Sequence, residues 1–318
     1  MNVHEFGEPP SAELARALAD FERQFVYPLG EGRWFRISHG EDYCRFFRAL
    51  GPARCFAAYR EGQIAGTLCA ARRRLCMPDG TEIDAAYFAD LKVASVAQRG
   101  RVVLELFAAA RQWAGTEELR AALAVVMDGT ASTPRRYTGR LGIPAFESLG
   151  QIAVLRISTA EAEPDAAGAL EPEPAAARAE QCHRLLCHDR CWAIGGDPGA
   201  RSECRPQWLL APDGSACGRL EDTRRAKRLI EAGGSEMMTA HLSSFAYRDV
   251  PSGAKLLRAA LAGSRRLGFP AMFVALVAED AAPLLRCMSG VPVLVAPATI
   301  FGIGIPPGLS WSINTAEI

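Results

Sequence analysis

The sequence repeats itself once, and this repeat constrains the fold more than any other feature. The segment "AAYREGQIAGTL" from Ala57 matches "LAPDGSACGRL", which ends at Leu220, and each predicts a strand, a tight glycine turn and a second strand. Glycines recur at offsets from 290 − 142 = 148 to 234 − 80 = 154 residues: Gly62 with Gly214, Gly66 with Gly218, Gly80 with Gly234, Gly115 with Gly268, and Gly142 with Gly290. The spacing predicts two copies of one α/β unit, with two unrelated α/β domains as the alternative.

The two copies are separated by a segment of different composition. Residues 158–181 read "STAEAEPDAAGALEPEPAAARAEQ", almost all Ala, Glu and Pro, without a core-forming period. Such composition is typical of a linker. We therefore expect an N-terminal unit over residues 1–157, a linker over 158–181 and a C-terminal unit over 182–318.

The order of apolar patterns within each unit predicts its sheet. Helices come first, then three strands joined by hairpins, then a helix, a strand, a helix and a strand pair. Hairpins produce antiparallel pairing, and a helical crossover produces parallel pairing. The fold class expected is α/β (α+β), with a mixed, mostly antiparallel sheet flanked by helices in each unit. One helix shows a clear buried face; its residues are Val103, Leu106, Phe107, Ala110 and Trp113.

Composition narrows the partners and the compartment. Lys+Arg and Asp+Glu are both 36, so the chain has no electrostatic footprint for nucleic acid or an anionic membrane. The N-terminal residues do not resemble a signal peptide, and the apolar run from Val291 is short and contains prolines. We expect a cytoplasmic protein with reduced cysteines, without a nucleic-acid or membrane partner. The oligomeric state stays open.

One cysteine- and histidine-rich stretch requires a separate interpretation. In "QCHRLLCHDRCW", Cys182, His183, Cys187, His188 and Cys191 lie close together but lack the C-x2-C spacing of structural zinc sites. We interpret the stretch as a helix with buried thiols and exposed histidines, and predict no metal site.

The stretch "ADLKVASVAQRGRVVLELF" from Ala89 combines a strand, a basic turn and a helix. Unpaired N–H groups at a helix N-terminus, together with the helix dipole, bind anions. Arg99 and Arg101 would add charge-assisted hydrogen bonds to phosphate oxygens. A basic loop without a ligand is the alternative. The arginine run Arg72–Arg74 is expected on a solvated strand face.

These residues resemble the GNAT superfamily of acyl-CoA-dependent N-acetyltransferases, in which a D-L-x-V strand segment precedes a Q/R-x-x-G-x-G/A turn and a helix. Here Asp90-Leu91-Lys92-Val93 precedes Gln98-Arg99-Gly100-Arg101. The resemblance implies acetyl-CoA as co-substrate, held by the backbone of Leu91 and Val93 where two strands splay. It also implies a pyrophosphate site at the turn, formed by Gln98, Arg99, Gly100, Arg101, Val102 and Val103.

The motif is partial, and it differs between the units. After Arg101 the chain lacks the second glycine of the family's turn. The C-terminal unit reads "YRDVPSGAKLL" at this place, where we expect Ser252 to cap the helix. Tandem members of the superfamily occur, mycothiol synthase among them, and one unit of such pairs is often degenerate. The C-terminal unit also has no tyrosine in "AAPLLRCMSGV", where the N-terminal unit has Tyr137, and this difference favours the N-terminal unit as the active one.

Acetyl transfer to an amine requires a base, a donor for the oxyanion and a proton for the departing thiolate. The resemblance assigns the last role to Tyr137, which precedes Gly142 by five residues where the family's spacing is four. Asp90 is the predicted base, because Asp128 reads as a turn residue. His39 is expected to be a solvated loop residue.

The sequence thus predicts an acetyl-CoA-dependent N-acetyltransferase acting on a small-molecule amine, with the N-terminal unit active and the C-terminal unit degenerate. The rival hypothesis is a non-catalytic tandem module that binds acyl-CoA or a protein partner. Transfer of a longer acyl chain is a third possibility.

Overall fold

A computed structural model describes residues 2–98, 101–162, 170–171 and 174–318. The first half contains β1 (Asn2–Phe6), α1 (Ala12–Glu22), β2 (Tyr27–Gly30), β3 (Arg33–Ser38), α2 (Arg45–Arg48), β4 (Ala53–Arg60), β5 (Gln63–Cys76), β6 (Glu82–Val93), η1 (Ser95–Ala97), α3 (Val102–Thr116), β7 (Ala121–Met127), α4 (Pro134–Tyr137) and β8 (Glu147–Ser158). The second half contains α5 (Ala176–Leu186), β9 (Cys191–Ile194), α6 (Pro198–Arg201), β10 (Gln207–Leu210), β11 (Ala216–Glu221), β12 (Arg228–Glu231), β13 (Ala240–Tyr247), α7 (Val250–Arg266), β14 (Ala271–Val277), α8 (Ala278–Cys287), β15 (Val293–Ile303), β16 (Trp311–Ser312) and η3 (Thr315–Glu317). No helix among these is long and apolar enough to cross a membrane.

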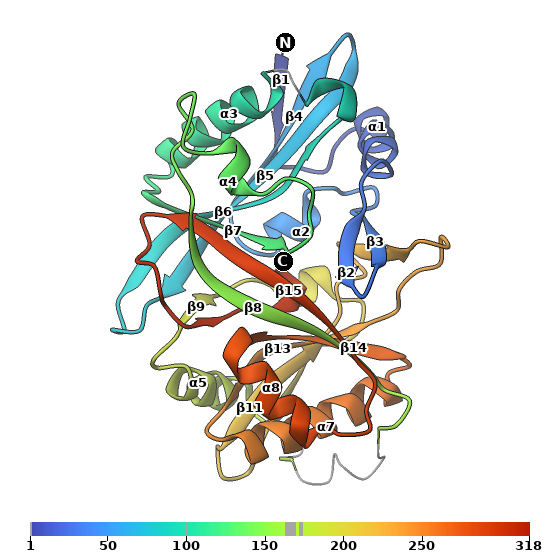
Figure 1. Ribbon diagram of the computed structural model, residues 1–318, viewed down its shortest axis with the longest axis vertical. Coiled ribbons are helices and arrows are strands. Elements are labelled where there is room, and N and C mark those ends of the chain that lie inside the picture. The colour runs from blue at the N-terminus through green and yellow to red at the C-terminus, as the bar shows by residue number, and fades with distance from the viewer. Residues whose placement is uncertain (1, 99–100, 163–169, 172–173) are drawn as a thin grey trace.

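The two halves share one thirteen-stranded sheet and exchange their last strands. Along its main path the order is β1-β4-β5-β6-β7-β15-β8-β14-β13-β11-β10. Strand β15 of the second half pairs with β7 of the first, and β8 of the first half pairs with β14 of the second. Figure 1 shows β8 and β15 crossing the middle of the molecule side by side. Each half is therefore completed by a strand of the other.

Two further strand pairs join the halves. Strand β12 of the second half pairs with β3, which forms a small second sheet with β2. Strand β9 of the second half pairs with the end of β5. The boundaries expected at residues 157 and 182 stay a prediction, while five strand pairs among the described residues join the halves through backbone hydrogen bonds.

The repeat has a packing basis at two glycines. A Cβ on Gly66 would lie 2.6 Å from Val102 Cγ1, in the first turn of α3. A Cβ on Gly218 would lie 2.8 Å from a Leu242 methyl and 3.3 Å from Leu256 Cδ2 in α7. In both halves the hairpin strand thus needs a glycine so that the following helix can approach the sheet.

A second repeated feature is a left-handed residue in one strand of each half, β6 in the first and β13 in the second. Asp90 in β6 has φ 58°, and Ser244 in β13 has φ 50°. The ladder register of the partner strand shifts nearby in both halves, between Thr67 and Cys69 and between Cys217 and Arg219. Non-glycine residues rarely adopt this conformation, and they concentrate at functional sites.

Helix α3 packs an apolar face on the sheet, and that face is rotated slightly about the helix axis from the predicted one. Leu106, Ala110 and Trp113 are buried as expected, whereas Val103 and Phe107 are only partly buried. Phe107 instead lines a cavity. The prediction of full burial was wrong for both residues; for Phe107 the reason is that an apolar side chain that lines a cavity satisfies the same periodicity as one in the core.

A buried ion network ties the C-terminal segment to both halves. Arg73 on β5 donates to Glu317 at 2.8 Å, and Arg201 donates to Glu317 at 3.3 Å and to Glu221 at 2.9 Å. Arg73 is 4% exposed, so its predicted place on a solvated strand face was wrong. The alternating pattern did not reveal this, because the partner of Arg73 lies 244 residues away.

The strand exchange predicts that neither half folds alone. Expressed separately, residues 1–162 would leave β7 without β15 and β8 without either neighbour, which exposes long unpaired edges. We expect each piece alone to lack a cooperative thermal unfolding transition, and the mixture with residues 170–318 to regain one, measured by circular dichroism. A piece that unfolds cooperatively at the temperature of the full chain would contradict the exchange.

Candidate active site

The first half contains an opening between two parallel strands. In the part of the chain that the structure describes, β6 pairs with β7 only from Ala85 to Tyr87. Beyond that point β6 continues beside β5 and β7 continues beside β15. In the described structure Val93 pairs with Gly66 of β5, Leu91 lies at the register shift between Thr67 and Cys69, and neither residue pairs with β7.

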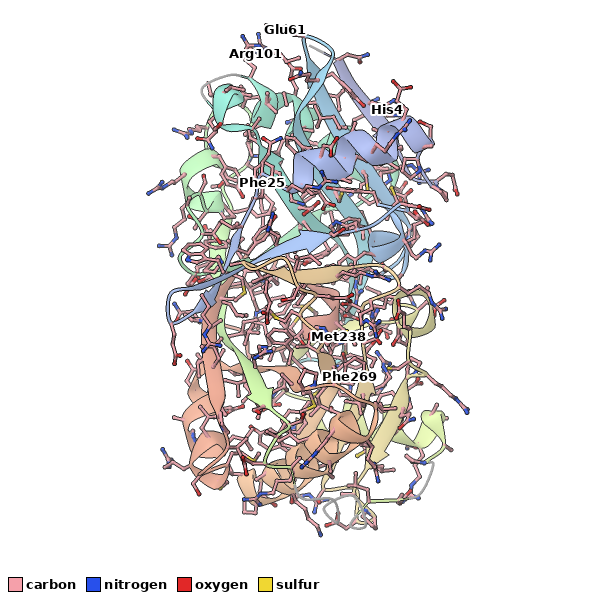
Figure 2. All side chains as sticks on the ribbon, turned by 90° about the vertical axis from the view of Figure 1, so that its right-hand side faces the viewer. His4, Phe25, Glu61, Arg101, Met238 and Phe269 are labelled. Atoms are coloured by element: carbon pink, nitrogen blue, oxygen red, sulfur yellow. The ribbon has the colours of Figure 1, made fainter. Side chains whose placement is uncertain are left out.

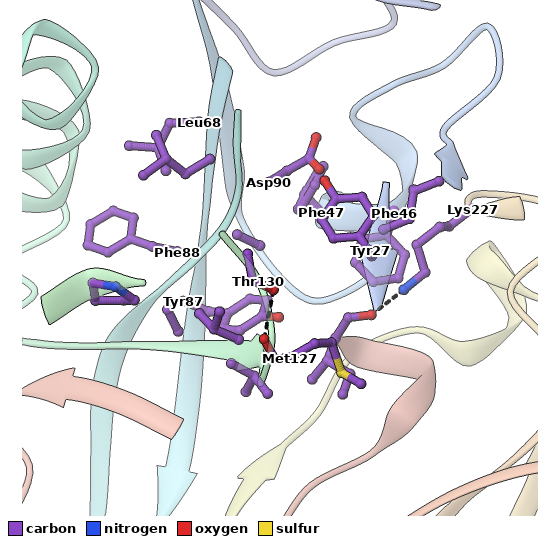
Figure 3. Close-up of a pocket in the computed structure, with 18 of the residues that line it drawn as sticks. Tyr27, Phe46, Phe47, Leu68, Tyr87, Phe88, Asp90, Met127, Thr130 and Lys227 are labelled. Atoms are coloured by element: carbon purple, nitrogen blue, oxygen red, sulfur yellow. Dashed lines mark hydrogen bonds between the residues drawn. The ribbon is translucent and has the colours of Figure 1, made fainter. Parts of the chain in front are cut away.

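A cavity of about 210 Å³ lies at this opening. Its lining is mainly aromatic and aliphatic, and it comes from both halves. Figure 3 shows Tyr27, Phe46 and Phe47 around it, with Tyr87 and Phe88 of β6 opposite. Further lining residues are Phe107, Tyr137, Phe146, Lys227, His241, Phe273 and Thr315. An apolar cavity with a few polar groups is the common form of a small-molecule site.

Three of the residues predicted from the sequence line this cavity: Asp90, Leu91 and Tyr137. Tyr137 is the last residue of α4, and its ring centroid lies 6.0 Å from that of Phe107. Burial raises the pKa of the Tyr137 phenol above its ordinary value. The hydroxyl is therefore held as a proton donor at neutral pH.

The predicted pyrophosphate turn lies apart from the cavity lining. Gln98 and Arg101 are exposed, Val102 is buried under Gly66 and Val103 is half-buried. Figure 2 shows Arg101 at the outer end of the first half, away from Met238 and Phe269 of the second. Arg101 is the N-cap residue of α3, and its side chain makes no capping hydrogen bond to a described residue. Arg99 and Gly100 lie outside the described residues.

The corresponding helix of the second half, α7, has an N-terminus that is capped by a side chain. The Asp249 carboxylate accepts a hydrogen bond from the backbone N–H of Ser252 at 2.8 Å. The expectation that Ser252 caps this helix was wrong, because the aspartate three residues earlier holds the N-cap position. Its negative charge lies where a phosphate would otherwise bind, which disfavours an anion at α7.

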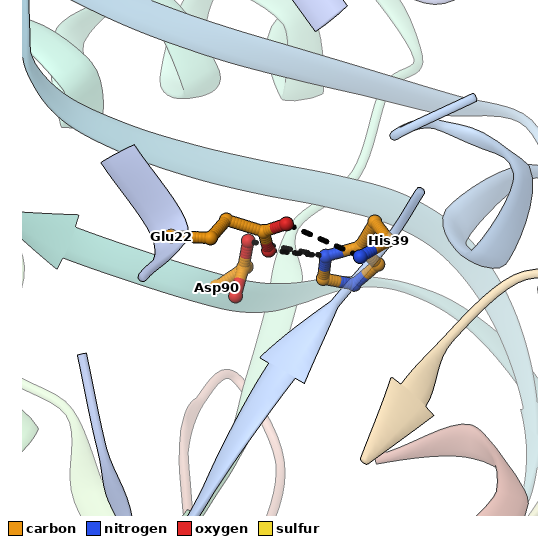
Figure 4. Close-up of side chains that lie close together, drawn as sticks. All are labelled: Glu22, His39 and Asp90. Atoms are coloured by element: carbon orange, nitrogen blue, oxygen red, sulfur yellow. Dashed lines mark hydrogen bonds and ion pairs between the residues drawn. The ribbon is translucent and has the colours of Figure 1, made fainter. Parts of the chain in front are cut away.

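A buried group of charged side chains surrounds Asp90. His39 Nδ1 lies 2.6 Å from Glu22 Oε1, and the backbone N–H of His39 donates to Glu22 Oε2 at 3.1 Å. Figure 4 shows these two residues with Asp90. Lys92 donates to Glu22 at 3.1 Å and to Asp90, and the Tyr43 hydroxyl also donates to Asp90.

The prediction for His39 was wrong, because the residue is 5% exposed. Its partner, Glu22, is the last residue of α1, which lies 17 residues earlier. No local signal in the sequence connects the two. Contacts between side chains from different elements determine this histidine's burial.

The charges in this group balance one another. Burial would raise the pKa of Asp90, but Lys92 and His39 more than offset it and the pKa is lowered. The pKa of Glu22 is lowered for the same reasons. Burial would lower the pKa of Lys92, but Asp90 leads the groups that raise it well above its ordinary value. The two carboxylates and the ammonium are therefore ionised together.

Glu22, His39 and Asp90 are also close enough together to hold a metal ion. However, the Lys92 ammonium contacts both carboxylates. It already supplies the positive charge that a cation would bring. We interpret the group as an ion network that fixes the left-handed backbone of Asp90.

The second half contributes polar groups that sequence reasoning missed. Lys227 donates to the backbone oxygen of Ile318, and its Nζ lies 4.2 Å from the Phe46 ring centroid. Burial lowers the pKa of Lys227 to about 7. His241 Nδ1 lies 2.9 Å from Thr315 Oγ1. The sequence around Lys227 and His241 gave no signal for them. Both residues line a cavity whose other wall comes from the first half, and this contact cannot be read from their own part of the sequence.

The cysteine- and histidine-rich stretch forms the end of α5, the turn after it and the start of β9. Cys187 Sγ lies 3.5 Å from His183 Nε2, and both residues are buried. His188 is exposed and contacts the backbone oxygen of Leu185. The expected buried thiol is present at Cys187, but the expectation that His183 is exposed was wrong, since it packs edge-on against the Trp192 ring.

Comparison with known proteins tests the fold. No protein-family model matches the sequence, and no curated protein matches it either. Among solved structures, *Saccharomyces cerevisiae* N-myristoyltransferase with bound myristoyl-CoA matches with a TM-score of 0.63 at 9% identity, over 98% of this chain and 85% of that one. The chain has the GNAT fold. The resemblance inferred from Asp90–Val93 is confirmed at the level of the fold, while the tandem arrangement inferred from the glycine repeat stays a prediction.

Two other structures agree. A second *S. cerevisiae* N-myristoyltransferase structure, with bound myristoyl-CoA and inhibitors, has a TM-score of 0.65 at 8% identity, over 99% of this chain and 83% of that one. A GCN5-related N-acetyltransferase from *Anabaena variabilis* has a TM-score of 0.51 at 13% identity, over 95% and 72% of the two chains. Identities this low establish the fold and leave the reaction to be argued from the site.

Lys92→Met tests the ion network. The substitution leaves Glu22 and Asp90 buried without their cation, so we expect the free energy of unfolding at neutral pH to fall by about 3–5 kcal/mol. The folded pKa values of both carboxyls are lowered, so their contribution is present above the ordinary values of 4.5 and 3.8 and is lost as the pH falls below them. The difference between wild type and variant should therefore shrink in acid, measured by urea unfolding.

Arg23→Met is the matched control, because Arg23 pairs with Asp20 in a bridge that is 70% exposed on both sides. Its effect should stay below about 1 kcal/mol. Equal effects of the two substitutions at neutral pH would contradict the network.

Proposed function

We propose that this chain is an acyl-CoA-dependent N-acyltransferase that transfers an acetyl group from acetyl-CoA to a small-molecule amine. The first unit is the active one, and the second is degenerate as a cofactor site. The observation that carries the proposal is the opening between β6 and β7. The two strands part after Tyr87, and the opening leads into a cavity that the left-handed Asp90 and Tyr137 both line.

The cofactor would extend along the first unit. Its pantetheine arm would pair with the free backbone edge of Leu91–Val93, because that edge lacks a strand partner on the β7 side. Its pyrophosphate would bind the turn Gln98–Val103 and the N-terminus of α3. The distance of Arg101 from the centre of the molecule in Figure 2 suits an extended ligand with its anionic end outside.

Tyr137 would protonate the departing CoA thiolate. Its raised pKa keeps the phenol protonated until the thiolate forms. The contacts of Asp90 conflict with its predicted role as a base, because Lys92 and Tyr43 donate hydrogen bonds to its two carboxylate oxygens. These contacts support a different role for Asp90, in which it holds the bend of β6 at the thioester.

The cavity lining supports a second candidate for the transferred group. Aromatic side chains dominate it, and such a surface favours an aliphatic acyl chain over an acetyl group alone. The yeast N-myristoyltransferase structures hold myristoyl-CoA. Comparing turnover with acetyl-CoA and octanoyl-CoA on one amine separates the two candidates.

Tyr137→Phe separates an enzyme from a non-catalytic acyl-CoA-binding module. Phe keeps the ring packing, so we expect CoA affinity to change little and kcat to fall by about 10²–10⁴-fold. Thiol release with acetyl-CoA or octanoyl-CoA and a panel of amines is the measurement. Tyr59→Phe, on β4 and outside the cavity, is the control.

Two results would count against this assignment. Full activity of Tyr137→Phe would remove the tyrosine from the mechanism while leaving an enzyme. Tight CoA binding by a wild type that acylates no amine would favour the non-catalytic module.

Arg101→Glu tests the pyrophosphate site. The substitution replaces a phosphate partner with a like charge, so CoA binding should weaken at least about tenfold, measured by calorimetry. Arg248→Glu changes the same kind of residue beside the N-terminus of α7, which Asp249 already caps. CoA affinity should not change there. A larger loss for Arg248→Glu would place the cofactor in the second unit.

A further inference from the structure

The second unit has its own strand opening, and it faces the same cavity. Parallel pairing of β13 with β14 covers Ala240 and His241, and it ends there within the described residues. Tyr87 ends the pairing of β6 with β7 in the same way. Both Tyr87 and His241 line the cavity. The strand exchange therefore directs the two openings toward one space.

His241 is placed there with one ring nitrogen unused. The residue is 3% exposed, and its Nδ1 lies 2.9 Å from Thr315 Oγ1. Its Nε2 is buried and has no hydrogen-bond partner among the described residues. Buried polar atoms are nearly always paired, so an unpaired ring nitrogen on a cavity wall indicates a ligand group that pairs with it.

We propose that His241 is the general base of the acyl transfer, and that its Nε2 takes a proton from the ammonium group of the acceptor. This inference rests on the function proposed above and adds that the second unit builds the acceptor half of the site. With Nδ1–H donating to Thr315, Nε2 carries the free lone pair that a base requires.

The surroundings keep this imidazole neutral. Burial lowers its pKa, and two cations, Lys227 and Arg201, lower it further. The other groups packed against it are Thr315 of η3, the Phe273 ring of β14 at 5.5 Å, and Glu221, its cross-strand partner on β11. The Glu221 carboxylate pairs with Arg201 and Arg219. No ion pair joins a carboxylate to the ring among the described residues.

The step balances as follows. His241 takes one proton from the ammonium, and the amine nitrogen attacks the thioester carbonyl carbon. As the tetrahedral intermediate collapses, the C–S bond breaks and its electron pair leaves on the CoA sulfur. Tyr137 gives its proton to the thiolate, and the second proton lost from nitrogen passes to the resulting tyrosinate, which restores the phenol. The products are the amide, CoA thiol and one proton, which His241 releases to solvent.

Acceptors that differ in protonation test the base directly. Benzylamine is an ammonium at neutral pH, whereas phenylhydrazine is neutral there and needs no deprotonation before attack. We expect His241→Gln to lower kcat/KM by about 10²–10⁴-fold with benzylamine and by less than about tenfold with phenylhydrazine. Raising the pH should recover part of the benzylamine rate in the variant, since the free amine then forms in solution.

Equal losses with both acceptors, or none, would overturn the proposal and leave the acyltransferase function standing. If the wild type acylates neither amine nor any other of the panel, the acyltransferase function and the base are both overturned. Unchanged CoA affinity and thermal unfolding show that His241→Gln is folded, and His241→Asn is the substitute if it is not.

NMR of the His241 imidazole in the wild type supplies a measurement that does not depend on enzyme activity. The His241 resonances, identified by their shift in Thr315→Val, should report a neutral ring with its proton on Nδ1 at neutral pH. Adding benzylamine should shift the Nε2 signal. A protonated ring, or a signal that benzylamine leaves unchanged at saturating CoA, would overturn the assignment.

Discussion

The exchange of the last strands is the constraint on which the rest of the structure depends. Because β15 pairs with β7 and β8 pairs with β14, one strand at each opening is held on its far side by a strand of the other unit. The cavity is therefore a joint product of both halves rather than a pocket within one. The buried ion pairs of Glu317 with Arg73 and Arg201 hold the C-terminal segment against this junction. Removing one partner would leave a buried charge uncompensated.

Two buried ion networks, centred on Asp90 and on Glu317, leave the space between them apolar. Each pairs its carboxylates with lysine or arginine, so the aromatic lining meets few uncompensated charges. Lys227 differs, because it contacts a backbone oxygen and a phenyl ring, and burial lowers its pKa to about 7. Its positive charge and that of Arg201 make the neutral form of His241 the stable one.

The repeated unit could be predicted from the sequence because its glycines stand where the backbone geometry requires glycine. Gly62 and Gly214 both have positive φ, and Gly66 and Gly218 both lie where a Cβ would strike a neighbouring side chain. Such requirements are local, and they survive when other residues differ. A family motif also predicted Asp90, Leu91 and Tyr137 as site residues; these three line one cavity, and their roles stay predictions. Strand exchange was beyond this reasoning, since an apolar pattern specifies a strand and not its partner.

The same limit explains the polar residues that were missed. His39 and His241 are determined by contacts between elements distant in sequence. The second unit looked degenerate because its helix N-terminus lacks the basic turn, and the structure adds a physical reason in the Asp249 cap. Yet its strand opening remains, and it presents His241 to the shared cavity. Under the proposed function, the second unit would not bind the cofactor's phosphates, and its backbone would instead position His241 opposite the thioester. Loss of one ligand site in a duplicated fold is therefore compatible with a gain of function at the junction.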